Sequence, residues 1–301
     1  MKKSNHQPYT FHSIAEMNKA LGMPPPLHPL IALNDYKNIT ADISDIVKGM
    51  LMDFYKISYK RNLSGKIKYG QHYYDFNEGG LSFISPNQLI AEDESNGECD
   101  GFTLLIHPDF LRGYSLTTTI KNYGFFSYSA NEALQLSEKE KETVLGIFKN
   151  IQDELEQRLD NFSQDVIISQ IELLLNYSNR FYNRQFITRK AVNNSLLTQM
   201  EKLLDDFFTT QEGLPTVHYL ADKLNVSPTY LSDLLRNLTG MNAQQHIHQK
   251  LIEKAKEILS TGNLSVAEVA YQLGFEHPQS FSKIFKRKTN LTPIEFKQSF
   301  N

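Results

Sequence analysis

Hydrophobic residues recur in two different rhythms along the chain. Between Asp53 and Tyr128, short runs rich in Tyr, Phe, Ile and Leu alternate with clusters of Gly, Asn, Ser and Pro, which is typical of strands separated by turns. The predicted strands are FYKISYK, KIKYG, HYYDF, LSFIS, QLIAE and FTLLIH. Because short, closely spaced strands build sandwiches and small barrels, this region predicts a β-domain with a concave interior.

Helical signals flank the predicted strands. Ser13 and Glu16 have the spacing of a capping box, which predicts a short helix over residues 11–22. Two longer helices are expected after the strands, over residues 137–159 and 165–185. The second of these has a broad apolar face, formed by Ile167, Ile168, Ile171, Leu174, Leu175 and Phe181. That face must be buried, either on the strands or on the same helix of a second copy.

The C-terminal third of the chain contains an internal repeat. The segment VHYLADKLNVSPTYLSDLLRNLTGMNAQQH, which begins at Val217, aligns with VAEVAYQLGFEHPQSFSKIFKRKTNLTPIEF, which begins at Val266, once an extra residue near His277 is allowed. Each copy predicts a helix, a tight turn and a second helix, because a small residue stands midway along the first helix and a proline opens the second. Two helix-turn-helix units are therefore expected, joined by a helix over residues 244–259.

The second helix of each copy has one apolar and one polar face. In the second copy Phe281, Ile284 and Phe285 are expected to turn inward, which leaves amide, hydroxyl and cationic side chains outside. Amides and hydroxyls can meet base edges in a major groove, and cations can bind phosphates or guanine. The residues expected to face DNA in this copy are Gln279, Ser280, Ser282, Lys283, Lys286 and Arg287.

In the first copy, the residues expected to face DNA are Thr229, Ser232, Asp233 and Arg236. Asp233 is unusual in such a place. Its carboxylate can accept a hydrogen bond from cytosine N4, yet it repels phosphate. The first unit is therefore expected to bind more weakly, or to select mainly against certain bases.

Both copies resemble the AraC/XylS family of bacterial transcription regulators. LSVAEVAYQLGFEHPQSFSKIFKRKTNLTPIEFK is similar to the family signature nearly throughout, and LADKLNVSPTYLSDLLRNLTG and KLIEKAKEIL match the elements before it. The resemblance implies two helix-turn-helix subdomains on a linker helix, which place their recognition helices in successive major grooves. It implies base-facing roles for Thr229, Ser232, Asp233, Gln279, Ser282 and Lys283. Asp233 departs from the basic or amide residue common at its place.

The resemblance also implies an N-terminal domain that is cupin-like, senses a small-molecule effector and dimerises. Members of the family typically activate promoters, so an activator of this kind would have RNA polymerase as a further partner. The response could instead depend on a partner protein. The aromatic segments HYYDF and GFFSYS could line an effector pocket or belong to the core.

Length and charge agree with a two-domain regulator. The chain has 301 residues, 40% apolar and 22% charged, which allows two folded domains. Residues 189–301 hold 13 Lys+Arg against 11 Asp+Glu, a net +2; this leaves −5 for residues 1–188, because the whole chain carries −3. We predict an α+β sensing and dimerisation domain over residues 1–185, a linker over 186–195 and an all-α DNA-binding domain over 196–301.

The sequence predicts no enzyme, metal site or cofactor. Cys99 is the only cysteine, which excludes an internal disulfide and a multi-cysteine zinc site and agrees with a free thiol in a reducing compartment. The one His-x-His pair, His246 and His248, lies on the joining helix, where residues two apart diverge. The histidines near the predicted strands form no such pair; they are His28, His72 and His107.

The chain has no apolar run long enough to span a bilayer, and its first residues lack the features of a secretory leader. We therefore expect a cytoplasmic protein without membrane contact. A homodimer is expected as well, although the sequence does not determine the oligomeric state, the operator, the effector or the direction of regulation.

Overall fold

A computed structural model describes residues 8–42, 46, 49–61, 63–69, 72–76, 79–90, 100–129, 132–157, 160, 162–188, 190–210, 213–261 and 264–299. The chain divides into two compact units, Met1–Gln185 and Phe186–Asn301, and each is described by itself. Cys99 lies outside the described residues, as do the side chains of the HYYDF segment.

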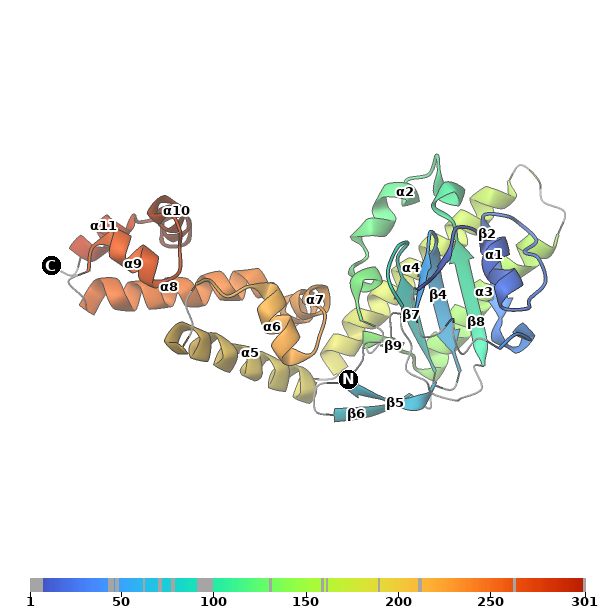
Figure 1. The fold of residues 1–301 in the computed structure, drawn as a ribbon, viewed down its shortest axis with the longest axis horizontal. Helices are drawn as coiled ribbons and strands as arrows, with labels where there is room; N and C mark the ends of the chain where they lie inside the picture. Colours follow the sequence, from blue (N-terminus) through green and yellow to red (C-terminus); the bar gives the residue numbers. More distant parts are fainter. Residues whose placement is uncertain are drawn as a thin grey trace. The chain divides into compact units, whose positions relative to one another are not determined.

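The first unit is built on a five-stranded antiparallel sheet (Figure 1). Its strand order is β2-β8-β4-β7-β9, so the central strand is β4 and the edge strands are β2 and β9. The strands are β2 (Ile31–Asp35), β4 (Tyr55–Lys60), β7 (Gly80–Ile84), β8 (Gly101–Ile106) and β9 (Leu134–Gln135). The described strands form an open sheet, and the closed, cupin-like arrangement stays a prediction.

Two small sheets complete the β-structure of this unit. β1 (Tyr9–Phe11) pairs in parallel with β3 (Met50–Met52), and β5 (Leu63–Tyr69) pairs antiparallel with β6 (His72–Phe76). The strand segments expected from the aromatic runs are therefore present. QLIAE is the exception, because its described residues make only a single bridge, Ile90 to Met50, after a turn in which Asn87 is left-handed with φ 61°.

Four described helices accompany these strands: α1 (Ile14–Ala20), α2 (Leu116–Thr119), α3 (Glu138–Glu156) and α4 (Ser163–Thr188). Short 3-10 helices lie at Tyr36–Asn38, Pro108–Leu111, Ile120–Asn122 and Gly124–Ser127. The capping box expected at Ser13 is formed, and Ser137 forms another with Glu140. Each satisfies backbone N–H groups that a helix start leaves unpaired, which explains where α1 and α3 begin.

The broad apolar face of α4 is buried within this unit. All six residues of the expected face are at most 6% exposed. Tyr182 of α4 stacks on Phe125 at 5.5 Å between ring centres, and Phe125 in turn contacts Phe83 of β7 at 4.3 Å. Of the two alternatives, packing within the same chain therefore explains the burial of this face, and a second copy is not needed for it. The GFFSYS segment supplies core residues, since Phe125, Phe126 and Tyr128 are buried.

The second unit is helical in all its described secondary structure (Figure 1). Its helices are α5 (Lys190–Thr210), α6 (Val217–Leu224), α7 (Pro228–Thr239), α8 (Ala243–Thr261), α9 (Val266–Gln272), α10 (Pro278–Thr289) and α11 (Pro293–Gln298). Residues 186–188 and 190–195, expected as linker, lie in the end of α4 and the start of α5. Asn193 Nδ2 donates to the Phe186 carbonyl at 2.6 Å and ties the two helices together there.

The turn between the first and second helix has the same geometry in both copies of the repeat. Asn225 after α6 and Gly274 after α9 are left-handed, with φ 55° and 87°. The next residue then donates its backbone N–H to the alanine in the middle of the preceding helix. Val226 N donates to the Ala221 carbonyl and Phe275 N to the Ala270 carbonyl, both at 3.0 Å. An Asn or Gly is needed because most side chains strain in this conformation.

The far ends of α7 and α10 match as well. Thr239 Oγ1 donates to the Leu235 carbonyl at 2.9 Å, and Thr289 Oγ1 donates to the Phe285 carbonyl at 2.8 Å. Gly240 and Asn290 then end the two helices in the left-handed conformation. The internal repeat of the sequence is thus a repeat of hydrogen bonds and turns. Among the described residues, no helix is long and apolar enough to cross a membrane.

Candidate nucleic-acid interface

Two buried aromatic residues set the rotation of α10 about its axis. Phe281 and Phe285 are fully buried, and their rings contact each other at 5.6 Å between centres. Phe275 and Phe296 close the cluster from either side, at 5.5 and 5.4 Å. The opposite face of α10 is consequently held towards solvent.

That outward face of α10 carries the residues expected to meet DNA. Gln279, Ser280, Lys283, Lys286 and Arg287 are exposed, and Ser282 is half-buried. Lys288, at the end of the same helix, is exposed too. The polar face is therefore most basic towards the C-terminal end of α10. The partial negative charge of the helix C-terminus stabilises cations there.

The positive potential at the end of α10 extends to a neighbouring helix. The pKa of His248 on α8 is lowered, first by burial and then by the charges of Arg287 and Lys288. Gln244, one turn earlier on α8, lies 3.0 Å from His248 between Nε2 atoms. The sequence pattern does not place these α8 residues at the interface, because only the folded chain brings them beside α10.

The rotation of α7 is set in the same way by Tyr230, Leu231, Leu234 and Leu235, which are all buried. Phe186 packs edge-on against Tyr230, with 5.3 Å between ring centres. Thr229, Ser232 and Asp233 are half-buried and Arg236 is exposed. The candidate residues of α7 thus share one side of the helix.

Asp233 forms an ion pair within α7. Arg236 Nη1 donates to Asp233 Oδ1 at 2.6 Å, over a spacing of three residues. This pair offsets the charge that made Asp233 unusual. The i, i+3 spacing in the sequence permits such a pair, although the pattern alone predicts two separate contacts with DNA.

A comparison with protein families matches residues 220–299 to a model described as a helix-turn-helix domain. The transcriptional activator RhaS of Salmonella dublin is 22% identical over 250 residues, which covers 82% of this chain and 86% of that protein. These matches support an AraC/XylS family transcription regulator.

Other proteins share only part of this AraC/XylS regulator. Histidine kinase P4 of Formosa agariphila is 24% identical over 139 residues, 46% of this chain but 10% of the kinase. The C-terminal domain of the two-component response regulator yesN from Fusobacterium nucleatum is 31% identical with a TM-score of 0.31, and the match covers 33% of this chain and 95% of that structure.

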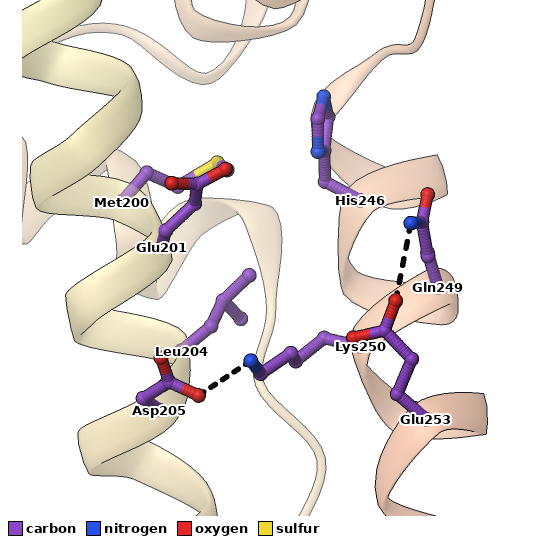
Figure 2. A pocket seen from close by; sticks show the side chains of 8 residues that line it. All are labelled: Met200, Glu201, Leu204, Asp205, His246, Gln249, Lys250 and Glu253. Atoms are coloured by element: carbon purple, nitrogen blue, oxygen red, sulfur yellow. Dashed lines mark hydrogen bonds and ion pairs between the residues drawn. The ribbon is translucent and has the colours of Figure 1, made fainter.

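A pocket in this regulator's second unit lies between α5 and α8 (Figure 2), and the residues that line it include none of the candidate DNA-facing residues. Lys250 Nζ crosses it to bind Asp205 Oδ1 at 2.6 Å, which raises the pKa of the lysine. The carboxylates of Glu201 and Glu253 also line it. Three acids against one lysine would repel phosphate, so the pocket does not extend the candidate interface.

The two histidines of the His-x-His pair have separate partners in the AraC/XylS unit. His246 Nε2 lies 2.8 Å from Thr239 Oγ1 at the end of α7, whereas His248 faces Gln244. Among the described residues, no group of three His, Cys, Asp or Glu side chains could hold a metal ion.

Proposed function

We propose that this AraC-type regulator reads two successive major grooves with α7 and α10. The observation that carries the proposal is the outward face of α10, where Gln279, Ser282 and Lys283 lie beside a basic helix end. A recognition helix needs this combination, because amides and hydroxyls read base edges while cations hold the backbone. The equivalent face of α7 presents Thr229 and Ser232.

Each group on these helices is assigned a role. Gln279, Ser282 and Lys283 contact bases, because Gln pairs with adenine, Lys with guanine O6 and N7, and Ser with several base edges. Ser280, Lys286 and Arg287 bind phosphate and fix the position of α10 along the duplex. On α7, Thr229 and Ser232 face bases, and Arg236 divides its charge between Asp233 and the backbone of the DNA.

The domain organisation belongs to the same proposal. Residues 1–185 form a cupin-like sensing and dimerisation domain, 186–195 a linker, and 196–301 the double helix-turn-helix domain. A small-molecule effector bound in the first of these controls the DNA-binding domain, and RNA polymerase is a partner if the protein activates. The cytoplasm is the compartment in which such a regulator meets its promoter.

An exposed apolar line on α4 supports the homodimer. Phe162, immediately before α4, is 72% exposed, and Val166 and Leu173 on the helix are 43% and 42% exposed, although the opposite side of α4 is buried. Their spacings of four and seven residues place them along one line of the helix. A second copy that contributes the same line would remove these residues from water.

Selection of genomic DNA fragments by the purified full chain tests the proposed function. The enriched fragments should share a motif with two half-sites about one helical turn apart, because two recognition helices on one face of the duplex repeat at that distance. Random recovery of fragments at every salt concentration would contradict sequence-specific reading. The genes beside the enriched fragments would indicate the signal.

A further inference from the structure

A row of polar residues crosses one face of the five-stranded sheet. Asn34 of β2 is opposite Thr103 of β8, Thr103 is opposite Ser58 of β4, and Ser58 is opposite Ser82 of β7. Residues directly opposite each other in adjacent strands share a face. Three of the four are buried, with Asn34 8%, Thr103 2% and Ser58 1% exposed.

The hydroxyl groups of this row are linked to one another. Ser58 Oγ lies 3.2 Å from Thr103 Oγ1, and Tyr36 donates its hydroxyl proton to Ser58 Oγ at 2.9 Å. Asn34 Nδ2 donates to Asn18 Oδ1 of α1 at 2.7 Å. A hydroxyl can take part in three hydrogen bonds. The row therefore keeps capacity for a ligand after its contacts with the described residues are counted.

Lys56 lies on the same face of β4, two residues from Ser58. It is 5% exposed, and its cross-strand neighbours are Ile84 and Leu105. No described residue forms a hydrogen bond or ion pair with its side chain. Buried charges are otherwise paired, because an isolated ammonium loses its hydration without compensation. Its three N–H donors need an acceptor.

We infer that Lys56 and the hydroxyl row bind the anionic group of a small molecule, a carboxylate or a phosphate. Residues two apart on a strand are separated by about 7 Å, which the lysine side chain can span. The ammonium then meets the charge of the ligand, while whichever of Ser58 and Thr103 accepts in their mutual hydrogen bond donates its own proton to a ligand oxygen. The inference rests on the proposed control by an effector and names the chemistry of that effector.

The first part of the test compares thermal unfolding of the full chain without added ligand. Lys56→Met keeps the length of the side chain and removes an unpaired charge, so Tm should rise by about 2 °C or more. Lys139→Met, on the exposed surface of α3, is the matched control and should leave Tm nearly unchanged. A lower Tm for Lys56→Met means that the lysine already has a partner within the chain, which overturns the inference.

The second part adds anions at tens of millimolar against sodium chloride of equal ionic strength. Acetate and inorganic phosphate represent the two sources of charge, and the better of them should raise the Tm of the wild type and of Lys139→Met. The same anion should not raise the Tm of Lys56→Met, and Thr103→Val should show a reduced rise. Equal rises in all four proteins reflect general salt effects and overturn the inference.

These measurements do not involve DNA. A failure of the anion site would leave operator binding by α7 and α10 intact, and a failure of operator binding would leave the Tm differences unchanged. Lys56→Gln serves as a second uncharged variant if Lys56→Met does not fold, with the same outcomes expected.

Discussion

The guanidinium of Arg236 binds the carboxylate of Asp233 one turn earlier on α7, with 2.6 Å between Nη1 and Oδ1. Their side chains are 54% and 24% exposed, so water and salt screen the pair and its contribution to stability is small. Under the proposed function the pair matters for DNA binding, because it offsets negative charge on the surface proposed to approach phosphate.

Asp233→Asn should strengthen non-specific binding to duplex DNA severalfold. The substitution releases Arg236 for a phosphate contact and removes the remaining repulsion, so the salt dependence should steepen by about one counterion. Fluorescence anisotropy with a random duplex over a salt series measures both quantities. Asp222→Asn, on the exposed surface of α6, makes the same charge change off the candidate face. If that control strengthens binding equally, the effect comes from net charge, and the position of Asp233 on the candidate DNA-facing side of α7 is contradicted.

Gly274→Ala should destabilise the second unit by about 2 kcal/mol or more. Gly274 has φ 87°, and a Cβ there would lie 2.2 Å from the backbone carbon of Gly213. Gly240→Ala is the comparison, because its φ is 78° but nothing lies within 4 Å of the added atom. That variant should lose about 1 kcal/mol from the backbone conformation alone. Urea unfolding midpoints measure both, and equal losses would show that the contact with Gly213 is unimportant.

The repeat shows how far the sequence predicts this fold. The prolines at 228 and 278, the capping boxes and the aromatic core positions all act within one turn of helix, and local sequence determines them. Strand β2 was not predicted, because Ile31–Asp35 has no alternating pattern and is recognisable only by its pairing with β8. The helical start of α5 was likewise expected as linker, since its first residues are polar.

Within the candidate site, the sequence predicts which residues of α10 face outward but not what lies beside them. Phe281 and Phe285 recur at helical spacing, so the outward position of Lys283 follows from the pattern alone. The proximity of His248 to Arg287, and in the other unit that of Ser58 to Thr103, joins segments far apart in the chain. Tertiary packing creates those contacts, and no local pattern encodes them.

Stability of the second unit should fall as the pH decreases from 7 towards 5. Burial and the charges of Arg287 and Lys288 lower the folded-state pKa of His248 below its usual 6.5, so the unfolded chain takes up a proton first. His248→Gln should reduce this loss, because Gln does not titrate. Urea midpoints at several pH values measure the effect, with His218→Gln on exposed α6 as the control. An unchanged pH slope in His248→Gln would contradict the assignment.

Leu173→Glu should weaken self-association of the full chain at least tenfold. The substitution places a charge on the exposed apolar line of α4, where a partner copy would have to desolvate it. Sedimentation over a concentration series measures the dissociation constant. Asn179→Glu adds the same charge to an exposed position off that line and should leave association unchanged. A wild type that stays monomeric at all concentrations, or a dimer insensitive to Leu173→Glu, would contradict the homodimer surface.

The most direct measurement is the affinity of Lys283→Ala for a duplex carrying the selected motif. If α10 lies in the major groove, this variant should lose about 1–3 kcal/mol of binding free energy, relax the preference at one base pair and keep its fold. Lys202→Ala, which removes an exposed lysine from α5, should bind as the wild type does. Equal affinity and equal base preference for both variants across the salt series would contradict the account.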